Sequence, residues 1–173
     1  MQKYLLLISL LLTSLYAQKS NTEILGDIFL LTLPLGTYGT TLYLEDDDGQ
    51  IEFYKSLGTT LVVTYALKYS VKEERPNHED NLSFPSGHSS TTFASASFIH
   101  MRYGFKYAIL PYLAAIYTGY SRVDSQQHYT SDVVAGALIG IASSWLFTSS
   151  YKNVKLQALS KNDYRGVSLS YKW

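Results

Sequence analysis

The chain has 173 residues, and its 14 Lys and Arg balance 14 Asp and Glu, so the formal net charge is zero. This length fits one domain with one core, and the charge balance gives no sign of the basic face that nucleic-acid binding requires. The absence of cysteine excludes a disulfide framework, a thiolate nucleophile and a cysteine-ligated zinc site.

The amino terminus has the pattern of an export signal. Met1-Gln2-Lys3 is a short positive start, the run Tyr4–Leu15 is apolar, and Ala17-Gln18 is a candidate cleavage point. The apolar run is short for a bilayer span, but it is also compatible with an uncleaved first membrane helix. Both interpretations place the next segment outside the cytoplasm. We therefore expect a secretory signal or short membrane helix over residues 1–17, and a helical domain over residues 18–150.

Five largely charge-free stretches follow, each long enough for three or more helical turns. Ala, Leu and Ile are frequent in them, and helix breakers lie mainly between them. The stretches cover residues 28–44, 56–67, 88–101, 107–121 and 133–151. This pattern predicts an all-α helical bundle.

The sequence leaves the relation of this bundle to a membrane open. Residues 133–151 are long and apolar enough to span a bilayer, whereas residues 88–101 are too polar to face lipid and the mean hydropathy is near zero. Sixteen tyrosines fit either interfacial belts or a water-soluble core. We expect a periplasmic domain that touches the membrane, with full integration in the inner membrane as the alternative.

The tail over residues 151–173 changes to an alternation of apolar and polar residues. Two alternating runs flank Asn162-Asp163, which is a turn signal. A period of two that a turn interrupts is typical of a small β-hairpin. We expect such a hairpin to pack on the bundle, with a frayed tail as the alternative.

Three strong cations stand out against the charge-free stretches. Lys68 closes one of them, Arg75-Pro76 follows, and Arg122 comes from a distant segment. Arginine offers a planar fork that matches phosphate oxygens, while lysine is a point charge. Each cation alone fits an ordinary surface charge. Together they would offset the desolvation of one phosphate dianion, so the set indicates an oxyanion site.

A second cluster, Pro85-Ser86-Gly87-His88, precedes a stretch rich in Ser, Thr and Ala. Backbone N–H groups at a helix N-terminus favour an anion, and Gly87 allows close approach of the backbone to a ligand. Ser86 adds a hydroxyl donor, although serine here also fits an ordinary helix cap.

The third cluster joins Ser121-Arg122 to His128 and Asp132. On a helix, a spacing of four would place His128 and Asp132 on one face within contact range. A carboxylate on one ring nitrogen fixes the tautomer and leaves the other nitrogen for attack. Asp132 also precedes an apolar run and so fits a helix cap.

The order Lys-x6-Arg-Pro, Pro-Ser-Gly-His and Ser-Arg-x5-His-x3-Asp resembles the three-part signature of the type 2 phosphatidic acid phosphatase family, which also includes the vanadium haloperoxidases. The resemblance covers residues 68–132 and extends through the small-residue run 133–136. It implies a helical bundle of the acid phosphatase and vanadium haloperoxidase type. One departure is Gln126, because many members have glycine two residues before the second histidine.

The resemblance also implies a metal-independent phosphatase that uses no cofactor. His128 would be the nucleophile that forms a phosphohistidine, Asp132 would orient it, and His88 would act as general acid and then as base. The implied phosphate ligands are Lys68, Arg75, Ser86, Gly87 and Arg122. A separate group, His78-Glu79-Asp80, has no matching ligand set elsewhere and predicts a solvated loop rather than a metal site.

We expect the substrate to be a phosphomonoester or diphosphate, with lipid phosphates preferred because apolar stretches accompany an export signal. The expected partners are this substrate and a membrane surface or bilayer, and not nucleic acid. The alternatives are a soluble non-specific acid phosphatase, a vanadium-dependent haloperoxidase and a non-catalytic envelope protein.

Overall fold

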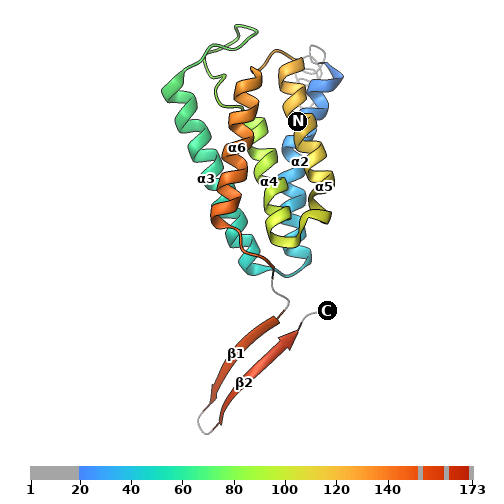
Figure 1. Cartoon of the computed structure of the whole chain (residues 1–173), viewed down its shortest axis with the longest axis vertical. Coiled ribbons are helices and arrows are strands. Elements are labelled where there is room, and N and C mark those ends of the chain that lie inside the picture. The colour runs from blue at the N-terminus through green and yellow to red at the C-terminus, as the bar shows by residue number, and fades with distance from the viewer. Residues whose placement is uncertain (1–19, 152–153, 162–163, 172–173) are drawn as a thin grey trace, which may run out of the picture.

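The structure is a computed structural model that describes residues 20–151, 154–161 and 164–171, and the signal predicted for residues 1–17 lies outside these ranges. Within residues 20–151, successive helices run in opposite directions (Figure 1). The five helices are α2 (Asn21–Tyr43), α3 (Asp47–Val71), α4 (Gly87–Tyr103), α5 (Phe105–Asp124) and α6 (Thr130–Phe147). The predicted all-α bundle is confirmed. Each predicted stretch corresponds to one helix, although the last helix ends four residues earlier than expected.

Helix α3 begins inside an acidic run. The Asp46 side chain accepts a hydrogen bond from the Gly49 N–H at 3.1 Å, and Asp47 and Asp48 occupy the first turn. Carboxylates are stabilising there because they face unpaired N–H groups and the positive end of the helix dipole. Asp46 is also buried, and Arg102 of α4 donates to it from Nε at 2.8 Å. This acidic run therefore starts one helix and ties it to another.

Helix α4 lies at the centre and packs against α2, α3, α5 and α6 (Figure 1). Its contact with α6 depends on glycine. A Cβ atom on Gly136 would lie 2.4 Å from the carbonyl oxygen of Ser86, and one on Gly140 would lie 2.2 Å from that of Ser90. Only residues without a Cβ allow this approach, so these two glycines set the distance between the two helices.

The bundle has a polar interior and an apolar exterior. Ser56 and Thr64 are fully buried, and their hydroxyls bond to Ser144 at 2.8 Å and Ser90 at 2.9 Å. Large apolar side chains lie on the outside, where the exposed fraction is 70% for Leu35, 75% for Leu110 and 70% for Trp145. A helical bundle in water has the reverse arrangement.

Two strands follow the bundle. β1 (Val154–Lys161) and β2 (Tyr164–Tyr171) pair antiparallel, with Val154 opposite Tyr171. This pairing matches the predicted hairpin. Figure 1 shows the strands beyond the end of the bundle, in place of the expected packing against it.

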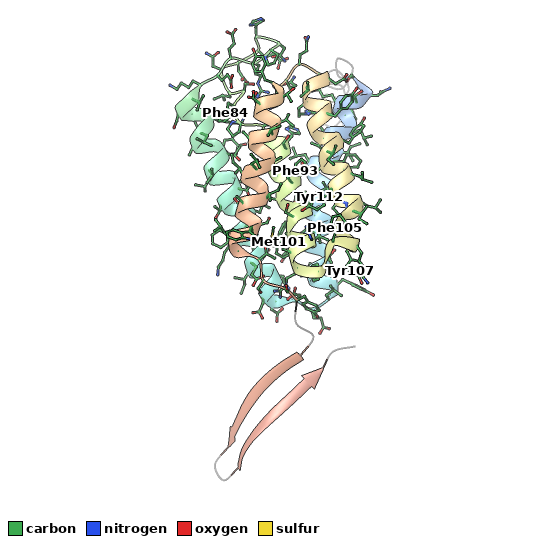
Figure 2. The ribbon with its side chains drawn as sticks, viewed as in Figure 1. Phe84, Phe93, Met101, Phe105, Tyr107 and Tyr112 are labelled. Atoms are coloured by element: carbon green, nitrogen blue, oxygen red, sulfur yellow. The ribbon has the colours of Figure 1, made fainter. Side chains whose placement is uncertain are left out.

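The connection between α3 and α4, residues 72–86, lies at one end of the bundle, and the turns from α2 to α3 and from α4 to α5 lie at the other (Figure 1). Figure 2 shows Phe84 at the first end and Phe105 and Tyr107 toward the second. All three sequence clusters fall at the first end. They occupy the end of α3, the start of α4, the end of α5 and the start of α6.

Candidate active site

A cavity of about 1010 Å³ opens at the end of the bundle that carries the 72–86 connection. Six of the eight residues that the sequence singled out line it, and they are Lys68, Arg75, Gly87, His88, Arg122 and His128. The other two, Ser86 and Asp132, are fully buried. The fold therefore brings together segments that lie far apart in the sequence.

Lys68 enters the cavity from the last turn of α3. It is only 7% exposed, and its ammonium group donates to the carbonyl oxygens of Leu82 at 2.5 Å and Ser83 at 3.2 Å. The helix ends at Val71, and Lys72 adopts a left-handed conformation with φ 53°. Arg75 therefore lies outside the helix, and the two cations do not share a helical face. They meet because the chain turns back.

Arg75 is held by groups on two connections. Its Nε donates to Asp80 Oδ1 at 2.7 Å, and its Nη1 donates to the carbonyl oxygen of Gln127 at 3.0 Å. Nη1 also lies 3.4 Å from Nε2 of His128. Burial acts to raise the pKa of Asp80, but the hydrogen bonds from Arg75 and from the Leu82 N–H, together with the positive charges of Arg75 and Lys68, outweigh burial, and the pKa is lowered. The ionised carboxylate thus fixes the guanidinium group at the cavity.

The second cluster forms the start of α4. Ser86 is the N-cap, and its Oγ accepts a hydrogen bond from the Ser89 N–H at 3.4 Å. Of the two roles considered for Ser86, the structure shows the cap, and this side chain does not line the cavity. A Cβ on Gly87 would meet no atom closer than 3.9 Å, so the space beside this residue remains open toward Lys68.

His88 and Arg122 share a carboxylate that sequence reasoning missed. Asp27 Oδ1 lies 2.9 Å from His88 Nε2 and 2.9 Å from Arg122 Nη1. The other terminal nitrogen of Arg122, Nη2, donates to the carbonyl oxygen of Glu23 at 2.7 Å. Both acidic residues belong to α2, which contains none of the three clusters. The one available signal was a lone carboxylate at the edge of an apolar stretch.

His128 lies in the connection before α6, so the prediction that a shared helical face pairs it with Asp132 is wrong. Asp132 is the third residue of α6, and its Oδ2 accepts the Tyr129 N–H at 3.0 Å. This capping contact folds the preceding residues back over the helix start. It leaves His128 Nδ1 3.5 Å from Asp132 Oδ2.

The surroundings of His128 keep its imidazole neutral. Burial lowers the pKa of His128 to about 3, and the positive charges of Lys68 and Arg75 act in the same direction, against the opposing Asp132 carboxylate. A neutral ring has one nitrogen with a free lone pair. Nδ1 faces Asp132 while Nε2 faces Arg75 at the cavity, so Nε2 is the ring nitrogen that faces the cavity.

Gln126, the departure from the common family pattern, has a left-handed backbone with φ 55°. Glycine adopts this conformation at less steric cost than any other residue. The chain therefore forms with glutamine a turn that glycine favours. The turn is fixed by hydrogen bonds from its N–H to the carbonyl oxygen of Val123 at 3.0 Å and from Asn77 N–H to its own carbonyl at 3.1 Å.

The group His78-Glu79-Asp80 lies in the 72–86 connection. The His78 side chain is 75% exposed and contacts Glu74 at 2.6 Å. Within the described ranges, no group of three or more histidine and acidic side chains is arranged to hold a metal ion. The exposure of the His78 side chain fits the solvated loop that the sequence predicted.

Comparison with known proteins gives consistent results. The PAP2 superfamily model matches residues 51–155. The lipid A 1-phosphatase of Porphyromonas gingivalis is 38% identical over 98 residues, which are 54% of this chain and 22% of that protein. The lipid A 4'-phosphatase of Helicobacter pylori is 32% identical over 169 residues, which are 87% of this chain and 85% of that protein. The chain thus spans about a fifth of the first relative and most of the second.

The fold is similar to that in the crystal structure of Aquifex aeolicus LpxE, with a TM-score of 0.55 and 23% sequence identity. The match covers 69% of this chain and 83% of that one. At 23% identity, this likeness shows that the two proteins share a similar helical fold.

Proposed function

The chain belongs to the PAP2 superfamily, and from that premise we propose that it is a lipid phosphate phosphatase that acts through a phosphohistidine at His128. The observation that carries the proposal is the convergence of three cations and two histidines on one cavity, with Asp132 beside the buried His128. The two relatives above are named lipid A phosphatases, which supports a lipid phosphate as the substrate class.

The first half-reaction transfers the phosphoryl group to the protein. The Nε2 lone pair of His128 attacks phosphorus, the new N–P bond forms, and the bond from phosphorus to the leaving oxygen breaks. His88 gives its proton to that oxygen, which departs as a neutral alcohol or as a phosphate. The Asp27 carboxylate, 2.9 Å from His88 Nε2, stabilises the positive ring that a general acid needs.

The second half-reaction restores the protein. His88, now neutral, takes a proton from a water molecule, and the water oxygen attacks the phosphorus of the phosphohistidine. The N–P bond breaks, inorganic phosphate forms and His128 returns to its neutral state. One histidine serves as acid and then as base because each half-reaction leaves it in the form that the other requires.

The cations stabilise the charge that develops on the phosphoryl oxygens. Lys68, Arg75 and Arg122 are all fixed by hydrogen bonds before any substrate binds. Donors that are already in place cost little reorganisation as the transition state forms. The N–H groups at the start of α4, beside Gly87, add a partial positive charge on the same cavity.

One wall of the same cavity is apolar, which supports an amphiphilic substrate. Leu30 and Leu31 of α2 and Leu61 and Tyr65 of α3 are among the residues that line the cavity. A small, water-soluble phosphate would leave these side chains without a partner. A lipid phosphate would place its head among the cations and its apolar part against this wall, and each buried CH₂ group contributes about 0.8 kcal/mol.

The apolar exterior supports a bundle that lies in the bilayer. Exposed Leu and Ile side chains occur on α2, α5 and α6, while the interior is built from hydroxyl-bearing residues. Helix Thr130–Phe147 is long and apolar enough to cross a membrane. The integral alternative therefore has more support than a periplasmic domain that only touches the surface.

Two features of the chain support a periplasmic position for the site. The segment predicted as an export signal leads into α2, and α2 begins at the end of the bundle that carries the cavity. The tail leaves from the opposite end and carries an excess of basic residues, which favours the cytoplasmic side. These basic residues are Lys152, Lys155, Lys161, Arg165 and Lys172.

The substrate class is tested with purified protein in detergent micelles. We expect long-chain phosphatidic acid, phosphatidylglycerophosphate, polyprenyl diphosphate or lipid A phosphates to be hydrolysed with kcat/KM at least about tenfold above that of p-nitrophenyl phosphate, because only they fill the apolar wall. Equal efficiency on soluble and lipid phosphates would contradict the lipid assignment.

The nucleophile is tested with His128→Ala. We expect turnover to fall by at least about 10³-fold while circular dichroism shows a folded helical protein, because no other side chain takes the same position. Brief reaction with ³²P-labelled substrate and rapid denaturation should label the wild type with an acid-labile phosphate and leave the variant unlabelled. His78→Ala, which removes an exposed histidine outside the cavity, is the control and should retain wild-type turnover. An active His128→Ala protein would rule out the mechanism.

A further inference from the structure

We propose that Ser83 is a positioning residue that joins His128 to Asp132 through its hydroxyl group and so sets the tautomer of the nucleophile. Ser83 lies three residues before Ser86, outside the three sequence clusters. The inference rests on the proposed function, because it concerns the same histidine. Its physical content, the location of one proton on His128, is measurable without any substrate.

The direct contact between His128 and Asp132 is long. Nδ1 and Oδ2 are 3.5 Å apart, whereas most N–H···O hydrogen bonds measure 2.7–3.2 Å. Ser83 Oγ lies 2.5 Å from the same carboxylate oxygen and 3.5 Å from Nδ1. The hydroxyl therefore completes a triangle with the ring nitrogen and the carboxylate.

The Ser83 hydroxyl donates its proton in a hydrogen bond to the Asp132 carboxylate. Ser83 Oγ is the donor in the 2.5 Å contact with Asp132 Oδ2. The Ser83 oxygen then presents its lone pairs to His128 Nδ1. Because both neighbours of Nδ1 are acceptors, the neutral ring must carry its proton there, and the lone pair remains on Nε2 at the cavity.

Main-chain contacts hold the hydroxyl in this place. Ser83 is fully buried, its N–H donates to the carbonyl oxygen of Glu73 at 2.9 Å, and its own carbonyl accepts from Lys68 Nζ at 3.2 Å. One residue of the 72–86 connection thus contacts a cation of the first cluster and both members of the pair in the third. A serine that only satisfied the Asp132 carboxylate would not also need to contact Lys68 and His128.

Kinetics of Ser83→Ala give the first test. We expect kcat on a long-chain phosphatidic acid to fall at least about tenfold with KM changed less than about twofold, because the cations that bind phosphate are untouched. Ser83→Thr keeps the hydroxyl and should recover most of kcat. Ser89→Ala is the matched control, since Ser89 is also a fully buried serine but its hydroxyl has no hydrogen-bond partner among the described residues. It should stay within about twofold of wild type.

A spectroscopic test uses protein labelled with ¹⁵N in its four histidines, with His128→Gln to assign the signal. Wild-type His128 should show the tautomer protonated at Nδ1, and Ser83→Ala should raise the fraction protonated at Nε2, while Ser89→Ala leaves it unchanged. If Ser83→Ala does not fold, Ser83→Cys provides a weaker donor of similar size for the same measurement.

The two tests separate this inference from the proposed function. A wild type that forms phosphohistidine, together with a Ser83→Ala protein of normal kcat and tautomer, overturns the role of Ser83 and leaves the phosphatase intact. A shifted tautomer in a protein that hydrolyses no phosphate supports Ser83 and overturns the phosphatase.

Discussion

At the scale of single residues, the site keeps a neutral histidine among positive charges. His128 is 3% exposed and lies near Lys68 and Arg75, so its protonated form is disfavoured. The pKa lowered to about 3 means that the Nε2 lone pair is available throughout the physiological range of pH. In the proposed mechanism, the same cations that bind the phosphate therefore also disfavour protonation of His128.

This burial has a consequence for stability against pH. Between pH 6.5, the ordinary pKa of histidine, and pH 3, the unfolded chain binds a proton at His128 that the folded protein does not. The contribution of His128 to stability is therefore lost progressively as the pH falls through this window. We expect the free energy of unfolding of the wild type to fall by about 2 kcal/mol more than that of His128→Asn between pH 6 and 4. Urea unfolding in detergent micelles measures it, and parallel curves for the two proteins would show that the ring titrates normally.

At the scale of elements, the site depends on how closely α4 and α6 approach. Gly140 lies against the Ser90 carbonyl oxygen, and Gly136 lies against that of Ser86. The second and third clusters lie at the starts of these two helices, so the separation of the helices fixes the distance between the start of α4 and His128. The N–H of Ser86 also donates to the carbonyl oxygen of Asp132 at 3.0 Å, which joins the helix starts directly.

Replacing Gly140 with alanine should separate the two helices. The new Cβ would lie 2.2 Å from one backbone atom and 2.6 Å from another, the Ala94 nitrogen, so the backbones must shift. We expect a loss of about 1–3 kcal/mol in unfolding free energy and a lower kcat. Gly58→Ala is the control, because a Cβ there meets nothing within 4 Å. That variant should be as stable as the wild type or up to about 1 kcal/mol more stable, through helix propensity. Equal melting curves for the two variants would contradict the close contact.

At the scale of the whole molecule, the distribution of polar and apolar side chains fits a bilayer better than water. Interior hydroxyls such as those of Ser56 and Thr64 bond to the hydroxyls of Ser144 and Ser90, so polar contacts take part of the place of an apolar core. If the bundle lies in a bilayer as proposed, its apolar exterior contacts lipid, and the charged cavity at one end of the bundle lies near the lipid headgroups.

Membrane integration is tested by extraction and by lysine substitution. We expect the protein to remain in the membrane fraction after alkaline carbonate and high salt. Ile116→Lys, in the middle of α5, should destabilise the inserted protein by about 2–3 kcal/mol. Tyr43→Lys, at the end of α2 and 87% exposed, should have little effect. Release by carbonate together with a harmless Ile116→Lys would indicate a peripheral protein.

The sequence by itself determined the five helices and the three clusters, because both depend on residues that are close together in the chain. Helix length follows from runs without breakers, and the clusters retain their spacing whatever the packing. The hairpin was also predictable, since its strands are neighbours in the chain. The family could be predicted for the same reason.

Only the tertiary structure decided which distant groups complete the site. Asp27 lies 61 residues from His88 and 95 from Arg122, and its local sequence, a carboxylate at the edge of an apolar stretch, does not identify these partners. Ser83 likewise acquires its contact with Asp132 across 49 residues. The sequence also did not decide which face of each helix points into the bundle. The mean hydropathy is near zero because it averages a polar interior with an apolar exterior. Contacts between distant segments depend on how whole helices pack, and local spacing does not carry that information.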